Sequence, residues 1–211
     1  MRLLTHRQHV LVGCLVCVCV MGAGPAQAAV EEQPGFAKQV NAVLEKRIDT
    51  LHTLIEDPVI LQAVRDSAVQ HKDITLPITL PDILRIDRKW IAKDKDVDPL
   101  IKSLTVNACA NHLMVFQDAH DGYPEIFIAD DKGLNVCQTN RTSDYMQSDE
   151  DWWVQGYNDG QGKTFYGKIE YDESAMSESI PVFLPVMDPD TKKAIGVMKV
   201  IVDITAIKRE L

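Results

Sequence analysis

The sequence lacks an excess of basic residues. Among its 211 residues, 22 are Lys or Arg and 31 are Asp or Glu, so the formal net charge is −9 at pH 7. A nucleic-acid-binding protein needs a basic face, because contacts from Lys and Arg to phosphates supply most of its non-specific affinity. We therefore predict that nucleic acid is not a partner of this chain.

The sequence also lacks an apolar run that would span a bilayer, which takes about 20 residues. The apolar stretch at 10–21 is shorter, follows Arg2 and Arg7, and precedes Ala26-Gln27-Ala28. A basic start, a short apolar segment and an A-x-A site are typical of a signal peptide, and the short length disfavours an uncleaved anchor. We predict a signal peptide at 1–28, cleaved near Ala28, and a periplasmic mature protein.

Histidine and cysteine are scarce, with six and five residues. The predicted leader contains three of the cysteines and leaves Cys109 and Cys137, which can form one disulfide or stay as two buried thiols. The remaining histidines form no His-x-x-x-His pair, and neither cysteine has a partner at metal-ligand spacing. We predict no metal site and no cofactor.

Signatures of catalysis are missing as well. Ser174 and Ser177 lie near acidic residues, but no G-x-S-x-G elbow surrounds them and no histidine is close in sequence. Glu150 and Asp172 are a conceivable carboxylate pair for glycoside hydrolysis, and nothing else in the chain supports that chemistry. We predict that the protein is not an enzyme.

The chain has a composition typical of one folded domain, with 45% hydrophobic and 25% charged residues. Its first part has the apolar periodicity of helices, and its second part has that of strands. Apolar residues from Phe36 to Ile55 form one stripe at helical spacing. Further helices are indicated by Asp-Pro pairs that match an N-cap and first turn. The expected elements are a helix at 36–56, a helix from Pro58 to about Gln70, a connector at 76–81, a helix that starts at Thr79 or Asp82 and passes Trp90, and a helix from Asp98 that ends at Gly122.

After Tyr123-Pro124 the pattern changes to that of strands. Glu125–Ala129 and Leu134–Gln138 flank a turn in which Gly133 suits a positive φ. Ser148–Asp151 has the spacing of a capping box that opens a short helix, which Gly160 and Gly162 end. Later strands are expected at Thr164–Tyr171, Ile180–Met187 and Ala194–Asp203, the last two joined by a turn at Asp188–Thr191.

Helices first and an antiparallel meander afterwards predict an α+β fold, with long N-terminal helices and a sheet of about five strands. The segments E-I-F-I-A-D-D-K-G (125–133), I-P-V-F-L-P-V-M-D (180–188) and A-I-G-V-M-K-V (194–200) resemble the hairpins of Cache domains, which are extracytoplasmic PAS-like sensor domains. The resemblance covers roughly 36–204 and implies a single Cache domain, with a helical region at 29–122 and a PAS-like sheet at 123–211.

One subgroup of Cache domains recognises amino acids through Tyr, then Arg five positions on, then Trp-Tyr, and a later Tyr-x-Asp. This chain is similar in spacing, with Tyr145, Trp152-Trp153 and Tyr171-Asp172, but Glu150 stands where the family has the Arg that pairs with a carboxylate. A second reading follows from charge: acids beside aromatic rings favour an amine ligand, weakly, over a carboxylate. In a third, Asp149 and Glu150 only stabilise the helix N-terminus.

The segment Ser143–Glu173 is thus the expected ligand-facing part. Trp152 and Trp153 point about 100° apart on a helix, and we favour Trp153 as the inward one because Tyr157 lies on its i+4 face. The candidate ligand-binding residues are Tyr145, Glu150, Trp152, Trp153, Tyr157, Tyr166, Tyr171 and Asp172.

The expected function is that of a periplasmic ligand-binding sensor domain. It binds a small molecule and signals through a partner, for which the resemblance suggests a membrane-bound receptor or kinase. The alternative is a protein-interaction module with no small-molecule ligand, in which both tryptophans form an exposed apolar patch. The long first helix can pair with a second copy of itself, although its apolar stripe serves an internal core equally well.

Overall fold

The structure, a computed structural model, describes residues 34–72, 80–172 and 177–211, all within one compact unit, Gln33–Leu211. The signal peptide predicted at 1–28 lies outside the described residues, as does most of the predicted connector. No helix in the described part of the chain is both long and apolar enough to cross a membrane.

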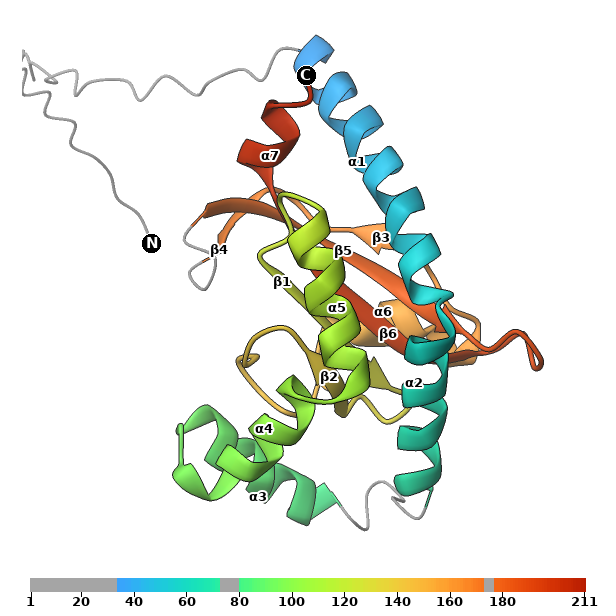
Figure 1. Cartoon of the computed structure of the whole chain (residues 1–211), viewed down its shortest axis with the longest axis vertical. Helices are drawn as coiled ribbons and strands as arrows, with labels where there is room; N and C mark the ends of the chain where they lie inside the picture. The colour runs from blue at the N-terminus through green and yellow to red at the C-terminus, as the bar shows by residue number, and fades with distance from the viewer. Residues whose placement is uncertain (1–33, 73–79, 173–176) are drawn as a thin grey trace, which may run out of the picture. The chain divides into compact units, whose positions relative to one another are not determined.

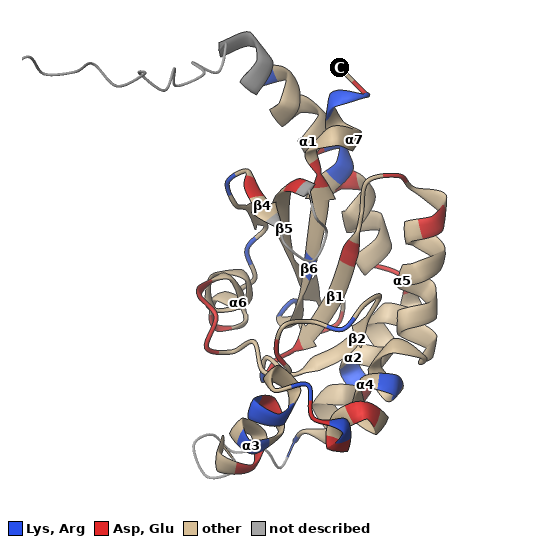
Figure 2. Ribbon diagram, turned by 90° about the vertical axis from the view of Figure 1, so that its left-hand side faces the viewer, with Lys and Arg blue, Asp and Glu red and all other residues tan. Residues whose placement is uncertain are grey.

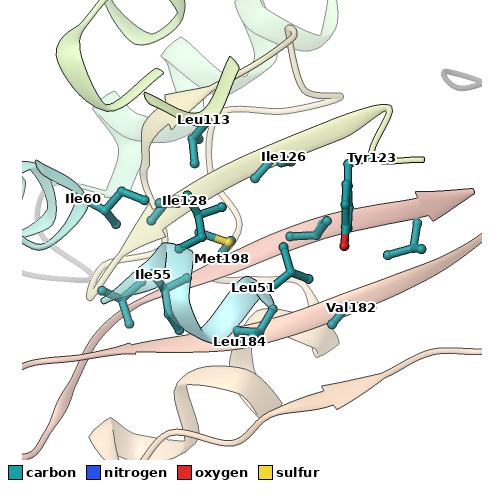
Figure 3. Packing of buried hydrophobic residues seen from close by; sticks show 14 of the residues in the cluster. Leu51, Ile55, Ile60, Leu113, Tyr123, Ile126, Ile128, Val182, Leu184 and Met198 are labelled. Atoms are coloured by element: carbon teal, nitrogen blue, oxygen red, sulfur yellow. The ribbon is translucent and has the colours of Figure 1, made fainter. Parts of the chain in front are cut away.

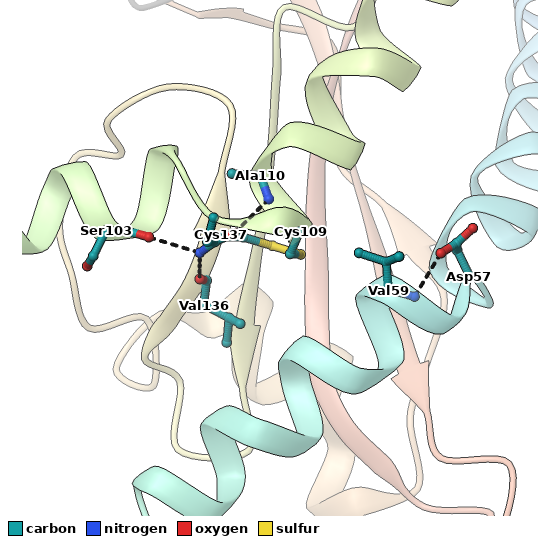
Figure 4. Close-up of a disulfide and its surroundings, with 8 residues drawn as sticks. Asp57, Val59, Ser103, Cys109, Ala110, Val136 and Cys137 are labelled. Carbon is teal, nitrogen blue, oxygen red and sulfur yellow. Dashed lines mark hydrogen bonds between the residues drawn. A yellow bond between two sulfur atoms is a disulfide. The ribbon is translucent and has the colours of Figure 1, made fainter.

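The first two helices form where the sequence predicts them. Helix α1 is Pro34–Ile55 and α2 is Pro58–Gln70 (Figure 1). Between them the Asp57 side chain accepts a hydrogen bond of 2.8 Å from the backbone N–H of Val59, as drawn in Figure 4, and Pro58 occupies the first turn of α2. An aspartate N-cap followed by proline starts a helix because the proline needs no hydrogen-bond acceptor there.

The single helix expected from Asp98 to Gly122 is wrong, because the chain forms two helices there. They are α4 (Asp98–Thr105) and α5 (Ala108–Ala119). Asn107 causes the break: its amide nitrogen donates to the carbonyl of Ser103, and its amide oxygen caps α5 by accepting from the N–H of Ala110. Asparagine competes in this way with the helical backbone, so it favours caps over helix interiors. Before α4 lie α3 (Leu80–Ile91) and the short 3₁₀ helix η1 (Lys95–Val97).

The strands form a six-stranded antiparallel sheet in the order β2-β1-β6-β5-β3, with β4 also paired to β5. The PAS-like α+β fold expected from the sequence is confirmed. The strands are β1 (Glu125–Asp130), β2 (Asn135–Gln138), β3 (Phe165–Tyr166), β4 (Glu170–Asp172), β5 (Ser177–Met187) and β6 (Ala194–Asp203). The expected turns are present: Gly133 has a φ of 74°, and residues 189–191 form the turn between β5 and β6.

The expected strand Thr164–Tyr171 is wrong as one element and consists of β3 and β4. Opposite the gap lies Pro181 of β5, whose carbonyl accepts from the N–H of Gly167 at 2.8 Å but whose ring nitrogen has no hydrogen to give back. The ladder resumes with Glu170 opposite Ser179, one residue out of step with the Phe165–Phe183 pair. Proline in a sheet removes a ladder hydrogen bond and is tolerated at such irregularities.

Two short helices complete the unit. Helix α6 (Asp151–Tyr157) is followed by the 3₁₀ helix η2 (Asn158–Gly160). The expected glycine ending is wrong: the left-handed residue that ends α6 is Asn158, with a φ of 49°, a conformation that asparagine adopts more readily than most residues, and Gly160 and Gly162 lie beyond the helix end. The sequence reading missed α7 (Ile204–Lys208), which begins directly after β6 with Asp203 as its cap.

The sheet separates two apolar layers because side chains alternate along each strand. Figure 2 shows α6 on one side of the strands and α5 on the other. The larger core lies between the sheet and the helices α1, α2 and α5. Figure 3 shows residues of this core from helices and strands, among them Leu51, Leu113, Ile128, Leu184 and Met198. Because neighbouring residues of a strand face opposite sides, Phe127, Phe183 and Lys199 of the same strands face α6.

Cys109 and Cys137 form a disulfide, with their Cα atoms 5.8 Å apart. The bond joins the first turn of α5 to β2, as Figure 4 shows. Of the two alternatives left open by the sequence, the structure has the bridge.

Candidate functional site

The candidate site lies on the sheet face that α6 covers. Three side chains in register form its floor: Phe127 of β1 and Phe183 of β5 both lie opposite Lys199 of β6. The two phenylalanines are buried, while the lysine is half-buried. A lysine in the middle strand of a row of aromatic residues is unusual for a sheet interior, because its ammonium must be stabilised there.

Trp152 of α6 forms the roof over this row. Its ring stacks on Phe183 with centroids 5.3 Å apart and meets Phe127 edge-on at 5.8 Å. The Lys199 ammonium lies 5.3 Å from the centroid of the Trp152 ring and 5.6 Å from that of Phe127. Both distances are within the range of a cation–π interaction. Among the described residues, no hydrogen bond or ion pair of the Lys199 ammonium is present in addition.

Trp153 anchors the helix rather than covering the floor. It is only 8% exposed, stacks on Tyr157 with centroids 4.8 Å apart, and donates its indole N–H to the carbonyl of Asp130 at 3.3 Å. Gly156 allows α6 to approach the sheet closely, since a Cβ there would lie 2.9 Å from a methyl carbon of Val197. The expected pairing of Trp153 with Tyr157 is therefore present, but it is Trp152 that lies over Lys199.

Glu150 is the N-cap residue of α6, but its side chain makes no capping hydrogen bond. The capping box expected at Ser148–Asp151 is therefore wrong: the N-cap is two residues after Ser148, and Asp151 is the first residue of the helix. Burial raises the pKa of the Glu150 carboxyl, and the neighbouring carboxylates of Asp144 and Asp149 raise it further, while Lys199 acts in the opposite direction. Glu150 thus stands within electrostatic reach of the lysine.

The other predicted site residues are not brought together with this group. Tyr145 is buried against Trp90, with ring centroids 5.7 Å apart, in a separate cluster with α3. Tyr166 and Tyr171 are 41% and 63% exposed. Asp172 ends β4, and its side chain lies outside the described part. The structure thus places Glu150, Trp152, Trp153 and Tyr157 around α6 and leaves the three tyrosines apart.

Sequence reasoning missed Lys199, Phe127 and Phe183. Their signal was present in strand alternation, because 197, 199 and 201 must share one face of β6 while 198, 200 and 202 share the other. A lysine on the first face could have been flagged as a charge inside the sheet. Which strands flank β6, and hence which aromatic residues surround the lysine, depends on the strand order.

In the part of the chain that the structure describes, no three His, Cys, Asp or Glu side chains are grouped so as to hold a metal ion. The α6 face combines aromatic rings with the ammonium of Lys199 and the carboxyl of Glu150.

No protein-family model and no curated protein matches the chain. Similar solved structures exist. The sensor domain of E. coli DcuS is 13% identical, with 82% of this chain and 97% of that chain covered and a TM-score of 0.45. The sensor domain of the V. cholerae histidine kinase DctB is 13% identical, with 83% and 57% covered and a TM-score of 0.36. The sensory domain of the Campylobacter jejuni chemoreceptor Tlp3, with isoleucine bound, is 13% identical, with 82% and 65% covered and a TM-score of 0.37.

All three of these solved structures are sensor or sensory domains. The isoleucine belongs to the Tlp3 structure. The class of the present chain follows from its own helices and strand order: it is an α+β domain with a PAS-like antiparallel sheet, one face of which carries a lysine under a tryptophan.

Proposed function

We propose that this chain is a non-catalytic, periplasmic sensor domain that binds a small molecule at the α6 face of its sheet and signals through a partner protein. One observation carries the proposal: Lys199 lies among aromatic rings, in the middle strand of the sheet, and no carboxylate among the described residues forms a hydrogen bond or an ion pair with its ammonium. A desolvated ammonium gains from an anionic ligand, because charge-assisted hydrogen bonds are about twice as strong as neutral ones.

The arrangement of the two tryptophans supports a ligand-facing role for α6 over direct docking of a protein. The interaction-module alternative requires Trp152 and Trp153 to form an exposed apolar patch. Instead Trp153 is buried, and Trp152 is half-buried and stacked on Phe183. Binding under α6 would shift this short helix, and a partner such as a membrane-bound receptor or kinase would read the changed surface.

The ligand class that Lys199 favours is a small molecule with a carboxylate. The acids near α6 suggested an amine, but the cation that faces Trp152 is the chain's own lysine. Glu150 stays within reach of a positive group on the same ligand. The amine preference remains a prediction that the following experiment tests.

The test is a thermal-shift screen of the full chain against carboxylates, amino acids, amines and nucleobases. A ligand at 100 times its Kd stabilises by about 2.7 kcal/mol, which is a rise of roughly 5–10 °C in Tm for a chain of this size. We expect a carboxylate-bearing compound to raise the Tm, and Lys199→Met to abolish that rise. The matched control is Lys193→Met, which removes an exposed lysine directly before β6, the strand that carries Lys199.

An unchanged rise in Lys199→Met would contradict a ligand at this lysine. Stabilisation by amines alone would restore the amine prediction, and the absence of any hit would favour the interaction module.

The predicted pairing of two copies through α1 is tested separately, by sedimentation. In the structure, Val40, Leu44 and Leu51 of α1 are already buried within the same chain.

A further inference from the structure

Helix α6 is held to the sheet by a small apolar cluster of its own. The buried members of this cluster are Ala129, Trp153, Phe183 and Val197, on the face of the sheet opposite to the larger core (Figure 2). The two clusters have no residue in common. Proteins open locally in such units, at a free energy below that of global unfolding. Detachment of α6 therefore disrupts the small cluster and leaves the larger core intact.

The helix has little stability of its own. It contains seven residues, whereas isolated helices shorter than about 12–15 residues are marginal in water. Gly156 lies within it, and glycine is among the least favourable residues in a helix. At its start, the Glu150 side chain makes no capping hydrogen bond. The position of α6 thus depends on its contacts with the sheet and on the chain at its two ends.

The chain before α6 is attached to the turn between β1 and β2. Gln147 is 2% exposed, and its backbone N–H donates to the carbonyl of Gly133 at 2.7 Å. The preceding residue, Met146, forms a β-bridge with Leu134. Because these contacts hold the chain on the N-terminal side, a movement of α6 requires a change of backbone conformation mainly on its C-terminal side.

The chain after α6 makes a left-handed turn at Asn158–Gly160, where the three successive φ angles are 49°, 52° and 80°. Residues other than glycine adopt this conformation singly rather than in succession, because their Cβ approaches the following carbonyl oxygen. Such strain persists where the surrounding structure holds it. Here the N–H of Lys163 donates to the carbonyl of Gly156 at 2.9 Å and closes the turn against the helix. The turn is therefore strained while α6 lies on the sheet.

We propose that α6 is a lid over Lys199, and that it opens as one unit about the left-handed turn at Asn158–Gly160. The inference rests on the ligand site proposed above and states how that site is reached. The ring of Trp152 stacks on Phe183 and lies over the lysine ammonium, so a ligand that approaches the ammonium from this side displaces the ring.

Two opposing contributions set the position of the lid. The apolar cluster and the hydrogen bond of 3.3 Å from the indole of Trp153 to the carbonyl of Asp130 favour the closed state. Strain in the turn favours the open state, because the turn relaxes when α6 leaves the sheet. The apparent affinity of a ligand that binds only the open state is lowered in proportion to the fraction of open molecules.

The test is amide hydrogen exchange of the full chain without ligand, at a pH where the rate reports the opening equilibrium. Asp159 is exposed, and Asp159→Gly removes the steric cost of its left-handed conformation. We expect this variant to slow exchange of the Val154 and Lys163 amides roughly fivefold. Asp159→Ala, which lacks the polar side chain that eases this conformation, should accelerate the same amides about threefold.

The matched control is Lys192→Gly. Lys192 is also exposed and has a φ of 59°, but it lies between β5 and β6. This variant should slow the amides of β6, which report global unfolding, and leave Val154 and Lys163 at the wild-type rate.

The lid is overturned if neither Asp159 variant changes exchange in α6, since the turn would then not be the hinge. It is also overturned if Lys192→Gly slows the α6 amides as much as Asp159→Gly does, since α6 would then open only with the whole protein. Because no ligand takes part, failure of this test is distinguishable from failure of the thermal-shift test of the ligand site.

Discussion

Glu150 and Lys199 show how the setting of a single residue decides its role on the α6 face. Both are charged residues within one half-buried region. Two aromatic rings stabilise the Lys199 ammonium, whereas the Glu150 side chain makes no capping hydrogen bond. Desolvation penalises a carboxylate that has no such compensation. Burial therefore makes the Glu150 carboxylate unfavourable for the fold at neutral pH.

Replacement of Glu150 by Gln is expected to stabilise the protein at pH 7. The folded chain holds the proton of Glu150 more tightly than the unfolded chain, because its pKa is raised by burial and by Asp144. Its favourable contribution is therefore complete below the unfolded pKa of about 4.3 and is lost as the pH rises through the folded pKa. The gain in Glu150→Gln should be small at pH 7, on the order of 0.5 kcal/mol for a partly exposed carboxyl, and should vanish near pH 3.

Urea unfolding at several pH values measures this difference. The control is Glu170→Gln, which removes an exposed glutamate of β4. A Glu150→Gln variant that is less stable than the wild type at pH 7 would show that the carboxylate makes a stabilising contact.

At this scale, the sequence predicts residues whose role is local. Asp57 before Pro58 is a cap by its own chemistry, and Gly133 suits its turn because a positive φ is a backbone conformation that favours glycine. Lys199 could not be assigned in this way, because its surroundings come from Trp152 and Phe127, which are distant in sequence.

At the scale of elements, the disulfide joins α5 to the edge strand β2. Cys109 and Cys137 are 28 residues apart and both are buried. In the loop-entropy model, a bridge that closes a loop of this length stabilises the fold by roughly 3–4 kcal/mol. The bond also holds together two walls of a cavity of about 400 Å³ between α2, the α4–α5 junction and β2, since Cys109 and the neighbouring Val136 both line it.

The double variant Cys109→Ser/Cys137→Ser should lose about 3 kcal/mol of unfolding free energy, measured by urea denaturation. Adding a thiol reductant to the wild type should produce a loss of the same size and leave the variant unchanged. If the wild type is insensitive to a reductant that reaches its unfolded state, the bridge does not carry this stability.

The elements themselves could be predicted where periodicity and capping agree, as in α1 and α2, in both hairpins, and in the order of helices before strands. The failures have two physical forms. The strand expected at Thr164–Tyr171 is interrupted opposite Pro181, a residue of another strand, so its own sequence does not reveal the gap. The break at Asn107 and the start of α7 after Asp203 are local caps, and both were within reach of local sequence reasoning.

At the scale of the whole described unit, the first and last described helices, α1 and α7, lie in contact. The apolar stripe of α1 covers the sheet, and the C-terminal α7 packs beside it. Arg47 of α1 joins them: it is 8% exposed, binds the Glu210 carboxylate through Nε at 2.9 Å, and donates to the Asp121 carbonyl at 2.8 Å. Its guanidinium also lies 5.0 Å from the centroid of the Tyr123 ring.

Arg47→Met keeps much of the apolar stem and removes all of these contacts, so we expect a loss of about 2 kcal/mol in the free energy of unfolding. Glu210→Gln should cost less than about 1 kcal/mol, because the Glu210 side chain is 37% exposed and a neutral amide can still accept from the guanidinium. Urea denaturation of both variants at pH 7 and two salt concentrations tests this. Equal losses of unfolding free energy in the two variants that disappear at high salt would assign the stabilisation to the ion pair. A larger loss in Arg47→Met that does not depend on salt would assign it to the buried contacts with Asp121 and Tyr123.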